Sequence, residues 1–199
     1  MKTLLYGGSF NPVHNGHLLC AREAMEQGGF SEVIFIPASN HAFKNNLISF
    51  HHRWNMLKLA VDGERGFDVS HIEGDRTEKS YTIDTVRAFE KAGFPDIHWL
   101  IGSDNINSLK RWHCYDELCK NVKFLVVNRN NDNYSDIPDQ NIKVLSVTNR
   151  VIEISSSDVR ERVFRKQSIK WLVPDKVAEY IYNHRLFLEG IKSELTKNL

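Results

Sequence analysis

The sequence predicts an α/β fold, a doubly wound parallel sheet covered by helices, with a small helical part at its C-terminal end. Short apolar runs alternate with amphipathic segments along most of the chain, which is typical of right-handed crossovers between parallel strands. A glycine-rich turn follows the first apolar run, at the edge where ligands bind in folds of this kind. We therefore expect residues 1–199 to form a single domain, with residues 150–188 as its C-terminal helical part.

The expected strands are apolar runs bounded by glycine, proline or polar residues. They cover residues 2–6, 32–37, 67–70, 98–102, 122–128 and 142–147. The expected helices carry apolar residues three and four positions apart. They cover residues 16–27, 49–63, 81–93, 155–166 and 174–185, with short helical or turn segments around 109–119. Ser49 is the expected N-cap of the second helix, because serine oxygens accept from the first free amides of a helix.

Composition and charge exclude several classes of partner. Hydrophobic residues make up 41% of the chain and charged residues 26%, which is ordinary for a globular domain. A formal net charge of +1 produces no global field that would attract nucleic acid or an anionic membrane, so we expect neither as a partner. Cys20, Cys114 and Cys119 form no CxxC pair, which argues against a disulfide framework and for a cytoplasmic location. Whether the chain forms a homo-oligomer is left open.

The turn "GGSFNPVHNGH", residues 7–17, matches neither of two common phosphate-binding motifs. It lacks the third glycine of GxGxxG, and no GK pair followed by Ser or Thr is present. What remains is His14 and His17 around Gly16, at the start of a helix whose free amides favour anions. Two imidazoles there would add hydrogen-bond donors, so the pattern favours a phosphate site. The alternatives are a loop cap beside a solvated histidine, or a zinc site, for which a third ligand is missing.

A second segment, "ISSSDVRERV" over residues 154–163, places three serines before a helix. On its own it is more typical of an N-cap than of a phosphate site.

Together, these two segments resemble the nucleotidyltransferase superfamily. The first resembles its GxFxPxHxGH signature, and the second resembles ISSTxxR with Ser157 in place of the usual threonine. "SYTIDTV" (80–86), "LIGSDNINSLKRW" (100–112) and "LVPDKVAEYI" (172–181) are further similar to the bacterial nicotinate-nucleotide adenylyltransferases. The resemblance covers nearly the whole chain and implies a Rossmann-like nucleotidyltransferase fold.

The resemblance implies that the 5′-phosphate of nicotinate mononucleotide attacks the α-phosphorus of ATP and releases pyrophosphate, without a covalent enzyme intermediate. Such a reaction requires alignment and charge stabilisation rather than a nucleophile. The implied catalytic residues are His14, His17 and Arg160. The implied ATP-binding residues are Gly7, Gly8, Ser9, Phe10, Lys44, Ser155 and Ser156. The implied acceptor-binding residues are Thr82, Asp104, Trp112 and Arg129. Mg²⁺ is expected to bridge the phosphates of ATP, with no protein ligand for it evident.

Several alternatives remain for the acceptor end. Trp112 could belong to the core, as a tryptophan in an amphipathic segment usually does. Thr82 and Asp104 could serve as helix caps, and Arg129 could be a solvated loop residue. The sequence also departs from the family pattern: "HAFK" (41–44) stands where Pro-Pro-His-Lys is usual, and His113 stands where tyrosine is common. The acceptor could therefore be nicotinamide mononucleotide or phosphopantetheine, and a nucleotide-binding sensor without turnover is a third hypothesis.

Overall fold

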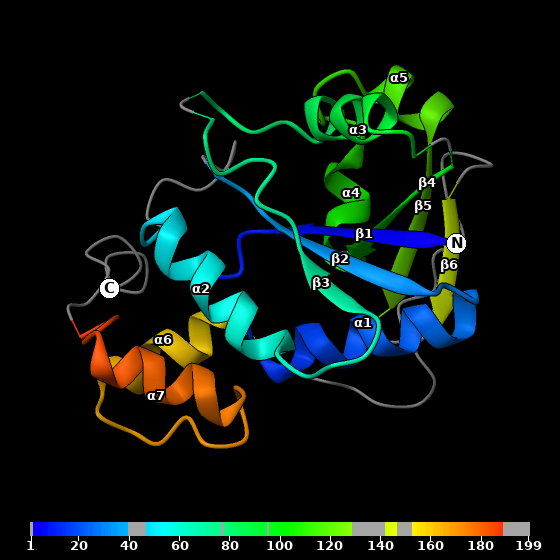
Figure 1. The fold of residues 1–199 in the computed structure, drawn as a ribbon. Coiled ribbons are helices and arrows are strands. Elements are labelled where there is room, and N and C mark those ends of the chain that lie inside the picture. The colour runs from blue at the N-terminus through cyan, green and yellow to red at the C-terminus, as the bar shows by residue number, and fades with distance from the viewer. Residues whose placement is uncertain are drawn as a thin grey trace.

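A parallel sheet forms the centre of the molecule (Figure 1). The computed structural model describes residues 2–39, 47–76, 78–94, 96–128, 142–146 and 153–188, and within these ranges six strands pair in the order β3-β2-β1-β4-β5-β6. The strands are β1 (Thr3–Gly8), β2 (Glu32–Pro37), β3 (Phe67–Val69), β4 (Ile97–Gly102), β5 (Val122–Asn128) and β6 (Ile142–Ser146). The predicted doubly wound parallel sheet is confirmed.

The order in which the chain adds strands to the sheet reverses between β1 and β4. The chain adds β2 and β3 on one side of β1, then returns to place β4 on the other, where Leu5 pairs with both Ile34 and Trp99. The crossovers on the two sides diverge here, which opens a crevice at the carboxyl ends of β1 and β4. The histidine turn leaves β1 at this point.

Helices cover both faces of the sheet (Figure 1). The described helices are α1 (Asn15–Gly28), α2 (Phe50–Val61), α3 (Thr82–Lys91), the 3₁₀ turn η1 (Ser103–Asn105), α4 (Ile106–Leu109), α5 (Tyr115–Asn121), α6 (Ser156–Phe164) and α7 (Asp175–Asn183). Ser49 caps α2 as predicted, since its Oγ accepts from the His52 amide at 3.4 Å.

The two faces of the sheet bury separate apolar cores, because side chains alternate along each strand. Leu4 and Tyr6 face α1, α2, α6 and α7, whereas Leu5 faces α3, α4 and α5. The C-terminal helices thus share a core with the sheet, through Val159 on α6 and Ile181 on α7. The single-domain assignment for residues 1–199 stays a prediction, as residues 189–199 lie outside the described ranges.

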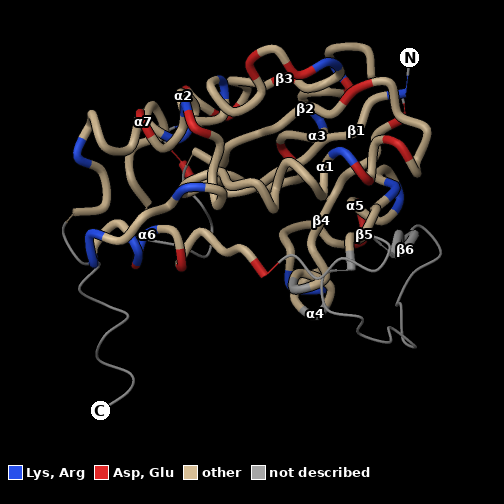
Figure 2. The backbone as a smooth tube through the Cα atoms, turned by 90° about the horizontal axis from the view of Figure 1, so that it is seen from below, with Lys and Arg blue, Asp and Glu red and all other residues tan. Residues whose placement is uncertain are grey.

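Charge is distributed without one dominant face. Lys and Arg lie interspersed with Asp and Glu along the described chain, in keeping with the net charge of +1 (Figure 2). None of the described helices is both long enough and apolar enough to cross a membrane. The three cysteines are free thiols.

We expect Leu100→Ala to lower the free energy of unfolding by about 2–5 kcal/mol, because the substitution opens a cavity in the middle of the sheet. Leu100 is 0% exposed on β4. Urea denaturation measures the change. Leu19→Ala is the matched control: that side chain is 40% exposed, and its loss should change stability by no more than about 0.5 kcal/mol. Equal losses in both variants would contradict this account of the core.

Candidate active site

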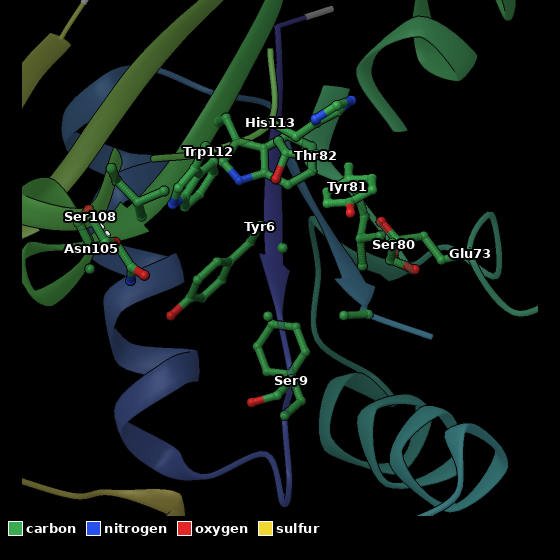
Figure 3. Close-up of a pocket in the computed structure, with 18 of the residues that line it drawn as sticks. Tyr6, Ser9, Glu73, Ser80, Tyr81, Thr82, Asn105, Ser108, Trp112 and His113 are labelled. Atoms are coloured by element: carbon green, nitrogen blue, oxygen red, sulfur yellow. Dashed lines mark hydrogen bonds between the residues drawn. The ribbon is translucent and has the colours of Figure 1, made fainter. Parts of the chain in front are cut away.

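A pocket of about 430 Å³ opens at the carboxyl ends of β1 and β4 (Figure 3). Its walls come from the β1–α1 loop, the segment before α3, and the stretch from η1 to the residues after α4. The lining residues are Tyr6, Gly7, Gly8, Ser9, Phe10, His17, Ile36, Ala38, Glu73, Ser80, Tyr81, Thr82, Trp99, Ile101, Gly102, Asn105, Ser108, Arg111, Trp112 and His113. Of the predicted ATP-binding residues, the four from Gly7 to Phe10 line this pocket.

The floor of the pocket depends on two glycines at the end of β1. A Cβ atom on Gly7 would lie 2.3 Å from Cζ2 of Trp99, and one on Gly8 would lie 3.0 Å from Cζ of Phe10. Phe10 itself is 1% exposed and has a φ of 43°, a conformation that side-chain-bearing residues rarely adopt. The aromatic rings therefore lie directly against the backbone of the turn, where larger residues would not fit.

His14 and His17 lie together at the N-terminus of α1, as the sequence suggested. Their rings stack with centroids 3.7 Å apart and an interplanar angle of 29°. His14 is the N-cap residue, and its backbone amide donates to Nδ1 of His17 at 3.2 Å. Because Nδ1 accepts this bond, the proton of the neutral His17 ring is on Nε2. His17 lines the pocket, whereas His14 is 2% exposed behind it.

The second signature meets the first from α6. Arg160 donates from Nη1 to the Asn11 carbonyl at 2.8 Å, and Ser156 Oγ donates to the Pro12 carbonyl at 2.8 Å. Ser155 is the N-cap of α6 and accepts from the Asp158 amide at 3.0 Å. The structure thus brings these predicted phosphate-binding residues against the outer side of the β1–α1 loop, and they are not among the residues that line the pocket.

The predicted acceptor-binding residues are only partly described. Thr82 at the start of α3 and Trp112 after α4 both line the pocket. Trp112 also packs edge-on against Phe124, with centroids 6.2 Å apart, so it contributes to both the core and the pocket. Asp104 lies in η1 between two residues that line the pocket, but its side chain is outside the described part of the chain, as are all of Lys44 and Arg129.

Several pocket residues were not among the predicted site residues, although the sequence marked His113 as a departure from the family pattern beside Trp112. His113 packs on Tyr81, with centroids 4.5 Å apart, and forms the wall opposite Trp112 together with Ser80 and Glu73 (Figure 3). Nothing in the short segment "HIEGDR" marks Glu73 as buried. Among the described residues, no group of three or more His, Cys, Asp or Glu side chains could hold a metal ion.

Comparison with known proteins agrees with this geometry. The model of the cytidylyltransferase-like family matches residues 5–162. The chain belongs to the cytidylyltransferase-like family. A curated relative from Methylacidiphilum infernorum, named "Probable nicotinate-nucleotide adenylyltransferase", is 38% identical over 191 residues, covering 94% of this chain and 92% of the relative. A protein of the same name from Exiguobacterium sibiricum is 38% identical over 190 residues, covering 94% and 99%.

The fold of this cytidylyltransferase-like chain also recurs among solved structures. Plasmodium falciparum nicotinic acid mononucleotide adenylyltransferase, complexed with NaAD, superimposes with a TM-score of 0.81, covering 95% of this chain and 100% of that one. At 20% identity this likeness concerns the fold. The predicted resemblance to nicotinate-nucleotide adenylyltransferases is confirmed, and with it the assignment as a nucleotidyltransferase.

We expect Gly7→Ala in this cytidylyltransferase-like protein to reduce stability by about 1–3 kcal/mol and to weaken nucleotide binding. The added methyl group can be accommodated only if the Trp99 ring moves, and that ring lines the pocket. Urea denaturation and calorimetric titration with ATP measure the two effects. Adding Trp99→Phe, which removes the ring atoms in conflict, should restore part of both losses. If the double variant is no better than Gly7→Ala, the contact with Trp99 is not the cause.

Proposed function

We propose that the chain transfers the AMP moiety of ATP to nicotinate mononucleotide and releases deamido-NAD and pyrophosphate. An oxygen of the acceptor phosphate attacks the α-phosphorus, while the bond between that phosphorus and the oxygen leading to the β-phosphate breaks. The observation that carries the proposal is that one pocket joins two kinds of residue. One end holds His17, in the first turn of α1, and the other end holds Trp112 and Thr82. The names of the relatives support this choice of acceptor.

At the ATP end, the chain's contribution is electrostatic. We assign the triphosphate to the turn from Gly7 to Phe10 and to the N-terminus of α1, where backbone amides and the helix dipole favour anions. Nε2–H of His17 donates to the α-phosphate, where negative charge develops in the transition state. His14 holds the orientation of that ring through the bond from its amide and through stacking.

The pyrophosphate end of ATP is assigned to the second signature. Arg160, Ser155 and Ser156 approach the β1–α1 loop from the N-terminus of α6, and a guanidinium there can bind phosphate oxygens in a bidentate manner. Lys44 is assigned to the same phosphates. Mg²⁺ neutralises phosphate charge when it is bound, and we propose that it arrives with ATP, whose oxygens supply most of its ligands.

At the acceptor end, the flat face of Trp112 suits a pyridinium ring, because a cation is attracted to the face of an indole. We assign Thr82 and Asp104 to the acceptor on the grounds of their place along the pocket wall and in η1. Arg129 is assigned to the acceptor phosphate. A cytoplasmic location and a homo-oligomeric state stay predictions.

The deciding experiment is an assay of pyrophosphate release by the purified protein with ATP and each candidate acceptor. Turnover with nicotinate mononucleotide, well above that with nicotinamide mononucleotide or phosphopantetheine, supports the proposal. A preference for either of the other acceptors leaves adenylyl transfer in place and removes nicotinate mononucleotide. ATP binding without turnover on any acceptor would instead favour a nucleotide-binding sensor.

We expect His17→Ala to lower kcat by about 100-fold or more, the effect of losing one donor to a transition-state oxyanion. Steady-state kinetics with saturating ATP and nicotinate mononucleotide measure this change. His51→Ala is the control, since His51 is an exposed histidine on α2 that does not line the pocket. A near-normal rate in His17→Ala would exclude the role assigned to this imidazole.

We expect Trp112→Ala to raise KM for the acceptor about tenfold, equivalent to about 1.4 kcal/mol, with little change in KM for ATP. The reason is that only the pyridine ring faces the indole in this assignment. Trp112→Phe, which keeps an aromatic face, should recover most of the affinity. Equal increases in both KM values would point to general disruption of the pocket.

A further inference from the structure

An arginine of α2 is buried beside the pocket without lining it. Arg53 is 1% exposed. Its guanidinium donates to three backbone carbonyls: Nη1 to Ser9 at 2.9 Å, Nη2 to Ser39 at 3.0 Å, and Nε to Ile48 at 3.1 Å. Burial lowers the pKa of Arg53 to about 10, partly offset by the charge of Glu73, so the group remains charged at neutral pH. Burying a charge is costly unless it is hydrogen-bonded or paired, and here three carbonyls accept from the guanidinium while Glu73 contributes an opposite charge.

The three carbonyls belong to two connections, one after β1 and one between β2 and α2. Ser9 lies in the turn at the ATP end of the pocket, Ser39 follows the end of β2, and Ile48 precedes α2. One planar fork of donors therefore fixes two connections at the carboxyl edge of the sheet relative to one another: the β1–α1 turn and the two ends of the β2–α2 connection. A lysine cannot replace it, because a single ammonium lacks the fork geometry.

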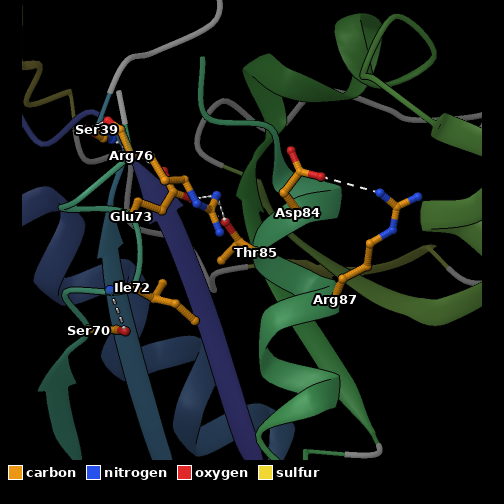
Figure 4. Close-up of polar contacts among 8 residues, drawn as sticks. All are labelled: Ser39, Ser70, Ile72, Glu73, Arg76, Asp84, Thr85 and Arg87. Atoms are coloured by element: carbon orange, nitrogen blue, oxygen red, sulfur yellow. Dashed lines mark hydrogen bonds and ion pairs between the residues drawn. The ribbon is translucent and has the colours of Figure 1, made fainter. Parts of the chain in front are cut away.

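Ser39 also links Arg53 to residues at the acceptor end of the pocket through hydrogen bonds (Figure 4). Its amide donates to Oε2 of Glu73 at 3.3 Å, and its hydroxyl donates to the Arg76 carbonyl at 3.0 Å. The other oxygen of Glu73 accepts from the hydroxyl of Thr85 at 2.5 Å, and this hydroxyl accepts from Arg76 Nη1 at 2.8 Å. Thr85 is 0% exposed on α3, one turn after Thr82.

We propose that Arg53 is a positioning residue that, through Ser39 and the Glu73–Thr85 pair, sets the ATP end of the pocket in register with the acceptor end. The inference rests on the proposed function. The ends of the network are Ser9 in the phosphate turn and α3, which carries Thr82. In-line transfer is sensitive to such a register, because a misplacement of about 1 Å costs about 100-fold in rate.

The test is kinetic and uses the full chain. We expect Arg53→Lys to lower kcat at least tenfold while KM for ATP and for nicotinate mononucleotide changes less than about threefold, since each half-site is intact and only their alignment is lost. Thr85→Val should behave in the same way, and Thr85→Ser, which keeps the hydroxyl, should retain the normal rate. Arg22→Lys is the matched control, because Arg22 also binds a carbonyl, that of Arg65, away from the pocket.

A double-mutant cycle gives the stronger criterion. If both residues act through the same alignment of the two ends of the pocket, the variant that combines Arg53→Lys with Thr85→Val loses little more kcat than the worse single variant. If they act independently, the two fold-decreases in kcat multiply. Rates are taken per folded molecule, with the folded fraction from urea denaturation. The inference is overturned by a normal kcat per folded Arg53→Lys molecule, by multiplying effects, or by a change confined to one KM. Absence of turnover in the unmodified protein would instead overturn the proposed function, and this inference with it.

Discussion

The structure depends on how the carbonyl groups of the β1–α1 loop are satisfied. A turn that binds phosphate must direct amides toward the ligand and keep carbonyl oxygens away from it, because those dipoles repel anions. Here the carbonyls of Ser9, Asn11 and Pro12 accept from Arg53, Arg160 and Ser156 respectively. These donors come from α2 and α6, far along the chain. The placement of both helices is thus tied to the first turn, which explains why a signature near residue 155 belongs with one near residue 14.

This arrangement also gives the arginines Arg53 and Arg160 a structural role besides any contact with substrate. Arg160 donates from Nη1 to the Asn11 carbonyl at 2.8 Å and from Nη2 to Ser157 Oγ at 3.1 Å. Its guanidinium is a planar fork of donors, a geometry that suits phosphate oxygens as well as carbonyls. In the proposed function, Arg160 therefore couples the shape of the turn to the bound phosphate. Arg53 supports the same turn from α2 and is 1% exposed, and neither arginine is among the residues that line the pocket.

Apolar periodicity located the strands and helices well, because each element buries one face against the sheet. His14 and His17 could be predicted as site residues because they lie at the start of a helix directly after β1, at the edge of the sheet where ligands bind. Arg53 was missed although a signal exists: on α2 it shares the buried face with Met56, Leu57 and Ala60, so a charged residue stands in an apolar stripe. Thr85 lies on the buried face of α3 with Val86 and Phe89, so periodicity could have indicated its burial but not its partner. Glu73 could not be found in this way, since its burial results from the connection between β3 and α3 folding back on Ser39. Tertiary contacts of irregular segments leave no periodic trace.

The side chains that line the pocket carry few fixed charges, although the proposed ligands are highly charged. Among its lining residues, Glu73 is the carboxylate and is ion-paired with Arg76 at 3.7 Å, while Arg111 is the guanidinium. The remaining polar contribution comes from backbone amides, hydroxyls, imidazoles and the Asn105 carboxamide. Oriented neutral donors stabilise charge that develops during transfer without reorganising. Arg160, which we assign to the phosphates, is not among these lining residues. In the proposed function the pocket therefore contributes neutral donors at the reacting phosphorus, and this guanidinium acts from outside it.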